Sequence, residues 1–392
     1  MPSPTASIKG RSWLYRGLYL VYLLVLLIAL ELGLRACSPI PAPKGMHYPP
    51  TWLQQSANPR KGYEPRPEQA GHNAAGFRGP EITLDKPQGT TRVAVIGDSV
   101  AWGLGVEAHQ TYSAVLPGML QARTDDPWEV VNMGVPGYGT VQIVEHFRER
   151  GLAYQPDVVV YGYWFNDFHQ FGCNDYHFPF FSGLRASAWE LYVTALLRWP
   201  WVEGSRDLLL GSQIVLRVVD LRWRLDTHAW QRHNEAAARM GLDAQDPELQ
   251  RFYGSWAQIT TELGSRADVE FLDAFLMDHY GRTAQESFVD YWRALHELKA
   301  LCQERDIPLV MLVTPVLRDV DAYDYQPLHD WVATLAEHLD IELVDTLPAF
   351  RQANYHTPMP LDGGPPDVAH PTPEGHRIIA EVLAERLAGQ GR

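Results

Sequence analysis

The chain has 392 residues, of which 46% are hydrophobic, 11% aromatic and 20% charged, and its formal net charge is −14. This apolar and aromatic content excludes an intrinsically disordered chain, and 31 glycines are far too few for a collagen. Nucleic-acid-binding proteins usually carry an excess of basic residues, so the acidic balance argues against a nucleic-acid partner. The length predicts either two domains or one domain with a large insertion.

An apolar stretch near the N-terminus predicts a membrane-spanning helix. Residues Gly17–Leu30 carry no charge, and counted to Leu34 the stretch approaches the ~17 residues that a spanning helix needs. Basic residues precede it and aromatic residues cluster at its start: Lys9, Arg11 and Arg16, with Trp13, Tyr15, Tyr19 and Tyr22. We therefore expect a cytoplasmic N-terminus (1–16), a transmembrane signal anchor (17–36), and the remaining chain on the periplasmic or extracytoplasmic side of the cell membrane.

Three other interpretations of this stretch stay open. A cleaved signal peptide would explain the short uncharged core, although no small-x-small cleavage site is evident. The sequence Leu34-Arg35-Ala36-Cys37 loosely resembles a bacterial lipoprotein cleavage box, which would place a lipid on Cys37. A buried core helix fits the position and the flanking residues least well.

After the anchor, the Pro-rich residues 37–70 are expected to form an extended linker. Beyond it, short runs rich in β-branched residues predict parallel strands that are covered on both faces: Arg92–Ile96, Glu129–Asn132, Asp157–Tyr161, Pro308–Val313 and Ile341–Val344. Helical patterns alternate with these runs: Gln110–Arg123, Thr140–Arg150, Ser287–Arg305, Tyr325–Leu339 and Pro373–Leu387. The alternation predicts a doubly wound α/β fold with a five-stranded parallel sheet.

One long interval interrupts the alternation. Residues 168–286 contain no clear core strand, although an ordinary connection would be much shorter. The interval is rich in tryptophan and has amphipathic patterns such as Ala188–Leu197 and Gln213–Leu225, so we expect a helical insertion that caps the sheet domain formed by 71–167 and 287–392. The chain has too few cysteines for a disulfide framework. Cys173 and Cys302 could form one disulfide bond, or both could be buried free thiols.

Candidate site residues follow the predicted strands. Ser99 comes directly after the first strand, where ligands bind in a doubly wound sheet, but it would serve equally as a helix N-cap. Gly134 after the second strand could present a bare backbone N–H, or simply form a turn. Asn166 after the third could present its side-chain NH₂ to an oxyanion, or form a turn with Asp167. Position 101 is Ala, so the G-x-S-x-G elbow of ordinary α/β-hydrolases is absent.

Near the C-terminus, Asp367 and His370 are three residues apart in the sequence Asp-Val-Ala-His. A histidine that acts as general base needs a carboxylate on its other ring nitrogen, and this spacing in a tight turn makes that bond easy. Metal ligation is the competing interpretation, but no second His or Cys stands at a suitable spacing. His376 falls inside the last helix and is expected to be structural.

Taken together, these motifs resemble those of the SGNH (GDSL-type) hydrolase family. Ser99 in GDS matches its first block, Gly134 its second, Asn166 in GYWFND its third, and Asp367 with His370 in DVAH its last. The resemblance implies a flavodoxin-like sheet, a catalytic triad of Ser99, Asp367 and His370, and an oxyanion hole of Ser99, Gly134 and Asn166. Residues 73–79 also resemble a segment that precedes this domain in membrane-anchored bacterial members, whereas the long insertion departs from the common core.

The resemblance implies a serine ester hydrolase that cleaves O-acyl esters, such as O-acetyl groups on envelope glycans or lipids, through an acyl-enzyme on Ser99. The expected substrate is an acylated small molecule, an acylated glycan or a lipid. The protein is expected to contact the membrane through its N-terminal helix. No metal or organic cofactor is required. An O-acyltransferase acting on an envelope polysaccharide would use the same triad, because the two activities differ only in which hydroxyl reaches the acyl-enzyme. A non-catalytic envelope-binding protein is the remaining alternative.

Overall fold

The computed structural model describes residues 6–37, 52–56, 58, 60–61, 63–167, 214, 246–264, 284–355, 359–360 and 366–389. The chain divides into two compact units. They consist of Met1–Met46 with Arg185–Ala229, and of His47–Leu184 with Trp230–Arg392. In the first unit the described part is the helix α1 (Ala6–Cys37) and Ile214; the second unit contains the sheet.

Helix α1 runs through the apolar stretch expected near the N-terminus. Its segment Tyr15–Cys37 is long and apolar enough to cross a membrane, and its most apolar part is not buried. Two of the three charged side chains in this segment, Glu31 and Arg35, pair with each other at 2.7 Å. Length and composition of this kind near an N-terminus are typical of a membrane anchor and of a signal sequence alike.

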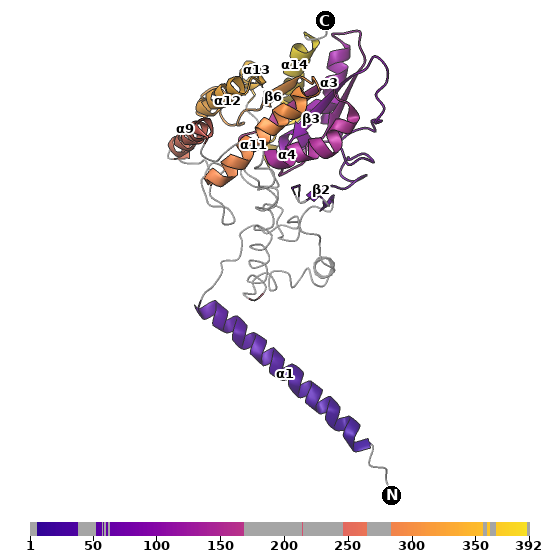
Figure 1. Ribbon diagram of the computed structural model, residues 1–392, viewed down its shortest axis with the longest axis vertical. Coiled ribbons are helices and arrows are strands. Elements are labelled where there is room, and N and C mark those ends of the chain that lie inside the picture. Colours follow the sequence, from indigo (N-terminus) through magenta and orange to yellow (C-terminus); the bar gives the residue numbers. More distant parts are fainter. Residues whose placement is uncertain are drawn as a thin grey trace. The chain divides into compact units, whose positions relative to one another are not determined.

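Five parallel strands form the sheet of the second unit in the order β4-β3-β5-β6-β7, which confirms the predicted doubly wound fold (Figure 1). The strands are β3 (Thr91–Gly97), β4 (Trp128–Asn132), β5 (Val158–Tyr163), β6 (Leu309–Val313) and β7 (Glu342–Asp345). Every residue of β5 and all but the first of β3 are buried, because helices cover both faces of the sheet. This is why the strands appear in the sequence as continuous apolar runs.

The longer helices are α3 (Tyr112–Gln121), α4 (Thr140–His146), α9 (Pro247–Gly264), α11 (Ala284–Gln303), α12 (Gln326–His338), α13 (Leu347–Gln352) and α14 (Pro373–Ala388). In the sheet, β4 lies on one side of β3, and the next strand along the chain, β5, lies on the other side. Since crossovers between parallel strands are right-handed, this reversal of direction places α3 and α4 on opposite faces. Helix α14 packs on α3 and α11 packs on α4, which completes the two helical layers (Figure 1). The reversal also makes the carboxyl end of β3 the switch point where ligands bind.

The structure adds a feature that the sequence did not indicate within residues 37–70, where a tether was expected. Strands β1 (Leu53–Gln55) and β2 (Tyr63–Pro65) pair as an antiparallel hairpin. Leu53 and Tyr63 are buried in the same core as the sheet, and the fully buried Lys61 forms ion pairs with Glu64 and Glu149. A few apolar anchors therefore bind this Pro-rich chain to the domain, although its composition has no strand period.

Within the expected insertion 168–286, the structure describes α9, which is helical as expected, and the start of α11. The expected helix Ala188–Leu197 and nearly all of Gln213–Leu225 lie outside the described residues, as does Cys173. Cys302 is a buried free cysteine in α11. The expected domain boundaries stay a prediction.

Candidate active site

Ser99 begins the one-turn helix α2 (Ser99–Trp102) immediately after β3. Asp98 caps this helix, since its carboxylate accepts the backbone N–H of Val100 at 2.8 Å. A glycine is needed at position 97, because a Cβ there would lie 2.7 Å from the carbonyl oxygen of Gly162 in the adjacent strand β5. The close approach of β3 and β5 thus fixes where the turn begins and sets Ser99 at the carboxyl edge of the sheet.

Three of the candidate site residues form one chain of hydrogen bonds. The Nε2 atom of His370 lies 2.8 Å from the Oγ atom of Ser99, which is 271 positions away in the chain. The Nδ1 atom of His370 lies 2.5 Å from the Oδ2 atom of Asp367, the last residue of β9 (Pro366–Asp367). Asp367 Oδ1 accepts the backbone N–H groups of Ala369 and His370, which closes the tight turn expected from the spacing.

The electrostatics of Asp367 favour its ionised form. Burial by itself would raise the pKa of this carboxyl, but the hydrogen bond and charge of His370, together with the two backbone N–H groups, lower the pKa on balance. An ionised Asp367 accepts the Nδ1–H of His370, which leaves Nε2 as the lone-pair nitrogen facing Ser99. In this tautomer the imidazole can take the hydroxyl proton of Ser99.

The three candidate oxyanion donors differ in their surroundings. The N–H of Gly134 donates to Asn132 Oδ1 at 3.0 Å, so an oxyanion would have to share or replace that bond. The N–H of Ser99 faces the carboxyl of Asp98, a group whose pKa burial raises. Asn166 follows β5 and is half-buried; within the described part of the chain no hydrogen bond holds its side chain, and its Oδ1 is buried.

Asn132 was not singled out from the sequence, yet its side chain joins two of the site's loops. Its Nδ2 donates to the carbonyl of Ala101 in α2 at 2.9 Å and to Ser113 Oγ at 2.8 Å. Its Oδ1 accepts the N–H of Gly134. The sequence signal that could have pointed to Asn132 is a polar residue that follows two apolar residues at the carboxyl end of a strand.

Asp167, the neighbour of Asn166, is buried and supports the turn after β5. Its backbone carbonyl accepts both the N–H and the hydroxyl of Thr140, at 2.8 and 2.9 Å, and its carboxyl accepts the Tyr161 hydroxyl at 2.9 Å. Burial, and then the nearby carboxyl of Asp98, raise the pKa of Asp167 well above its usual range. These contacts give Asp167 a structural role in the turn after β5.

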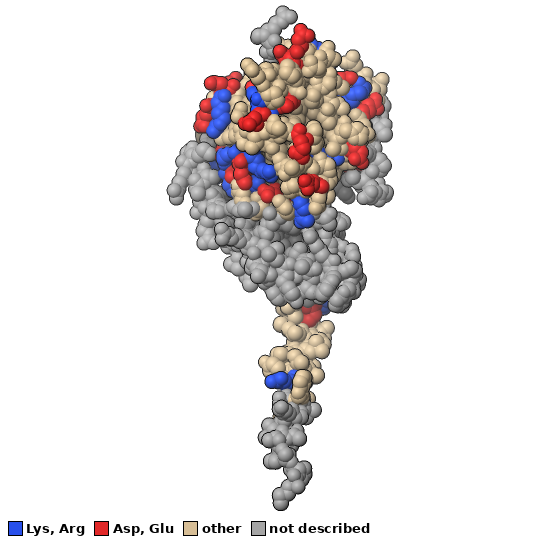
Figure 2. All heavy atoms as spheres, turned by 90° about the vertical axis from the view of Figure 1, so that its right-hand side faces the viewer, with Lys and Arg blue, Asp and Glu red and all other residues tan. Residues whose placement is uncertain are grey.

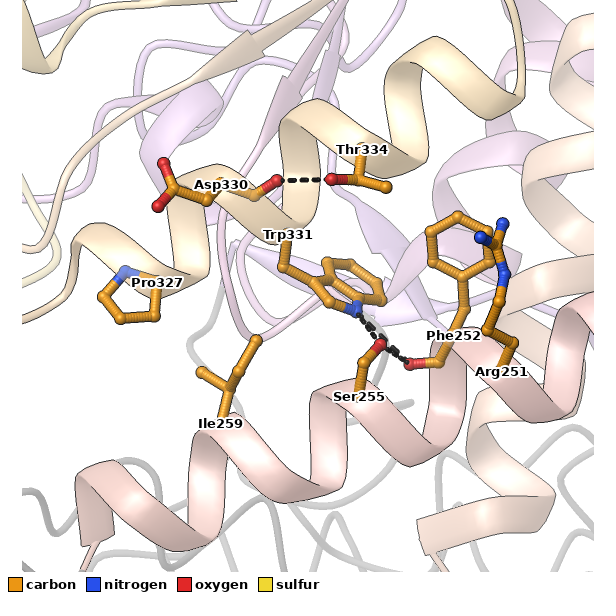
Figure 3. A pocket seen from close by; sticks show the side chains of 8 residues that line it. All are labelled: Arg251, Phe252, Ser255, Ile259, Pro327, Asp330, Trp331 and Thr334. Atoms are coloured by element: carbon orange, nitrogen blue, oxygen red, sulfur yellow. Dashed lines mark hydrogen bonds between the residues drawn. The ribbon is translucent and has the colours of Figure 1, made fainter.

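An open cavity of about 400 Å³ lies apart from these residues, between α9 and α12 (Figure 3). Trp331 from α12 points toward α9, where its Nε1 donates to Ser255 Oγ at 3.0 Å and to the carbonyl of Phe252 at 3.2 Å. Arg251 and Asp330 add the charged part of the lining, and no lining residue belongs to the Ser99 site. Among the residues that the structure describes, no group of three His, Cys, Asp or Glu side chains is arranged to hold a metal ion.

Comparisons with solved structures give matches of low identity. A catalytic mutant of Axe2, an acetylxylan esterase from Geobacillus stearothermophilus, is 15% identical with a TM-score of 0.37, covering 75% of this chain and 93% of that one. LAE5, an alpha/beta hydrolase enzyme from the metagenome of Lake Arreo, Spain, is 16% identical with a TM-score of 0.38, covering 76% and 95%. The acetyl xylan esterase AlAXEase is 13% identical with a TM-score of 0.38, covering 76% and 99%. No curated protein matches the sequence.

A family model described as the GDSL-like lipase/acylhydrolase family matches residues 95–296, which is more than half of the chain. The matched region includes Ser99, Gly134 and Asn166 and ends before Asp367 and His370. The chain therefore belongs to the GDSL-like lipase/acylhydrolase family and is a carboxylic ester hydrolase.

Proposed function

We propose that the chain is a serine ester hydrolase that cleaves O-acyl esters, O-acetyl groups on envelope glycans or lipids among them, with Ser99 as the nucleophile. The supporting observation is the hydrogen-bonded chain from Asp367 through His370 to Ser99, at 2.5 and 2.8 Å. A serine hydroxyl is a weak nucleophile until an adjacent base removes its proton, and these two bonds supply and orient that base.

In the first half of the reaction, His370 Nε2 takes the proton of Ser99 as Oγ attacks the ester carbonyl carbon. The resulting oxyanion is stabilised by the side-chain NH₂ of Asn166 and by the backbone N–H groups of Ser99 and Gly134. His370 then returns the proton to the leaving alcohol, and the acyl group stays on Ser99. In the second half, His370 takes a proton from water as the water oxygen attacks the acyl carbonyl carbon. The bond between that carbon and Ser99 Oγ then breaks, His370 returns the proton to Oγ, and the acid is released. Side chains supply every proton transfer, so these steps need no cofactor.

Replacement of the nucleophile tests this proposal. Ser99→Ala removes Oγ from a buried, hydrogen-bonded position without adding volume, so we expect the variant to fold and to lose hydrolysis of p-nitrophenyl acetate. Ser255→Ala is the matched control, because Ser255 contacts Trp331 in a different part of the domain. Unchanged esterase activity in Ser99→Ala would refute the assignment. Acyl transfer to an added glycan at the expense of hydrolysis would instead identify a transferase.

We further propose that α1 is an uncleaved signal anchor that holds the catalytic domain on the periplasmic side of the cell membrane. The proposal is supported by the exposed apolar surface of Tyr15–Cys37 and by the basic residues that precede it. Acylated glycans or lipids of the envelope would then lie within reach of the tethered enzyme.

A further inference from the structure

The turn that carries Ser99 cannot be stable by itself. Helix α2 has four residues, and a single helical turn costs more conformational entropy than its hydrogen bonds return. Its position must therefore come from packing. The last residue of α2, Trp102, has the largest side chain of the four and is 5% exposed.

Trp102 is held by side chains that come from the chain before β3. Its Nε1 donates to His72 Nε2 at 2.9 Å, while His72 Nδ1 lies 3.1 Å from the carbonyl of Arg66. This arrangement needs a neutral His72 that donates from Nδ1 and accepts at Nε2. The Trp102 ring also stacks on Trp52, with 4.9 Å between the ring centroids and 11° between the planes.

Arg78 contacts the same indole and both loops of the site. Its guanidinium carbon lies 3.4 Å from the centroid of the Trp102 ring, and its Nη2 donates to the carbonyl of Val106 at 2.5 Å. Its backbone N–H donates to the carbonyl of Asn132 at 3.2 Å. The Asn132 side chain in turn holds Ala101 and the N–H of Gly134. Arg78 therefore connects the Ser99 turn with the Gly134 loop.

These two loops are in direct backbone contact. A Cβ added at Gly134 would lie 2.4 Å from the backbone nitrogen of Trp102. With no side chain between them, any shift of Trp102 changes the distance from Ser99 to the N–H of Gly134. The reaction depends on that distance, because both groups act on the same carbonyl group.

The buried guanidinium is costly for folding. Arg78 is 8% exposed, and in the described structure its Nε and Nη1 atoms are buried without a hydrogen-bond partner. Burial lowers its pKa to about 10, and contact with the Trp102 ring offsets only part of the desolvation. A hydrophobic side chain of similar length would fill the space at a lower cost, so packing alone does not account for an arginine here.

We infer that His72 and Arg78 are positioning residues for the reaction: through Trp102 they hold the Ser99 turn against the Gly134 loop. The inference rests on the proposed role of Ser99. Both residues lie outside the matched family region 95–296, between the expected linker 37–70 and β3. The chain before β3 is thus part of the catalytic apparatus and not only a connection to α1.

The test compares two substitutions at His72 with one at Arg60. His72→Leu removes the acceptor and orphans the indole N–H, whereas His72→Gln keeps an acceptor near the position of Nε2. Arg60→Met breaks ion pairs of the same segment to Glu145 and Glu297 and serves as the control. Each full-length variant is assayed for kcat and KM on p-nitrophenyl acetate, for the rate of fluorophosphonate labelling of Ser99, and for thermal unfolding.

We expect His72→Leu to lower kcat and the labelling rate ~10- to 100-fold with KM nearly unchanged, because a misplacement of about 1 Å has that effect. His72→Gln should regain most of the loss. Arg60→Met should lower the unfolding temperature while kcat stays within about twofold. If His72→Leu does not fold, Arg78→Lys replaces it: Lys keeps the charge but cannot stack on the indole, and it should show the same loss of kcat.

Labelling of Ser99 at the wild-type rate in folded His72→Leu or Arg78→Lys would overturn the inference while leaving the proposed function intact. An equal loss of kcat in Arg60→Met would also overturn it, because the effect would then be general to the segment. If wild-type protein is not labelled at Ser99, the inference fails together with the proposed function.

Discussion

His370 can accept the proton of Ser99 only while its own proton sits on Nδ1, and Asp367 is the group that keeps it there. Asp367→Asn offers an amide NH₂ in place of the carboxylate, which favours the opposite tautomer. The backbone bonds from Ala369 and His370 can still be accepted by the amide oxygen, so the turn should persist. We expect kcat for p-nitrophenyl acetate to fall on the order of 10⁴-fold with little change in the unfolding temperature. A fall of less than tenfold would contradict the role given to Asp367.

Asn166 is the candidate oxyanion donor whose side chain is not engaged by other described residues. Asn166→Ala should lower kcat on the order of 10²- to 10³-fold, because the donor acts on charge that develops only in the transition state. KM should change little for the same reason. Asn166→Asp, which replaces the donor with a negative charge, should be at least as impaired. Steady-state kinetics of both variants check this, and an active Asn166→Asp would exclude the donor role.

The catalytic candidates could be read from the sequence, but their supports could not. Ser99, Asp367 and His370 belong to short motifs whose chemistry depends on residue type and spacing. The partners of Trp102 are different: His72 and Arg78 lie between the Pro-rich stretch and β3, in a segment with no helical or strand period. Their roles follow only from long-range packing, as does the bond between Asn132 and Ala101. Sequence periodicity carries no information about such contacts.

At the scale of the elements, the strands were predictable because burial on both faces leaves few polar positions in them. The run Asp157–Tyr161 corresponds to β5 at Val158–Tyr163, and Pro308–Val313 to β6 at Leu309–Val313. The β1–β2 hairpin was not predictable, because three-residue strands are too short to show a period of two. Its place in the core depends on single anchors such as Tyr63, whose hydroxyl donates to the carbonyl of Pro136.

The close approach of β3 and β5 gives a prediction for element packing. Gly97→Ala would set a Cβ 2.7 Å from the carbonyl oxygen of Gly162, which is backbone in a central strand and cannot move away cheaply. We expect a loss of about 1–3 kcal/mol in the free energy of unfolding. Gly118→Ala in α3 is the matched control: its Cβ meets nothing within 4 Å, and it should stabilise the protein by about 0.5–1 kcal/mol. Urea unfolding of both variants measures the difference, and equal stabilities would refute the packing argument.

For the whole molecule, the formal charge of −14 does not produce one uniform acidic surface on the face seen in Figure 2. Acidic and basic side chains are interspersed there over the described residues. Such a surface favours solubility and offers no strong attraction to polyanions.

Stability should depend on pH through His72. Burial, with a smaller contribution from the charge of Arg78, lowers the pKa of His72 to about 4, below the ~6.5 of an unfolded chain. Between these values the unfolded state binds more protons, so this group's contribution to stability is complete above about pH 6.5 and is lost as the pH falls toward 4. The raised pKa values of the buried Asp98 and Asp167 act in the opposite direction, so the effect of His72 has to be isolated by substitution.

The substitution His72→Gln isolates the contribution of His72, because glutamine can accept the hydrogen bond from the Trp102 indole N–H but does not titrate. Between pH 6.5 and 5, wild type should lose about 1.5 kcal/mol more unfolding free energy than the variant. Urea titrations of both proteins at the two pH values give this difference directly. Parallel losses in the two proteins would show that His72 does not titrate in this window.

The orientation of the chain can be tested with a reporter. If α1 is an uncleaved anchor, alkaline phosphatase fused after residue 46 should be active in a bacterial host, and the fusion should stay in the membrane after carbonate extraction. Release of a soluble product that lacks about the first 36 residues would identify a cleaved signal peptide. Incorporation of labelled palmitate at Cys37 would identify a lipoprotein.

If an acyl group resides on Ser99 during turnover, a reagent that traps reactive serines should modify this residue. Intact-protein and peptide mass spectrometry after treatment with a fluorophosphonate should show a single adduct on Ser99 in wild type. Asp367→Asn should form the same adduct far more slowly. An adduct on another residue, or esterase activity that persists after Ser99 is fully modified, would show that the acyl group is not carried by Ser99.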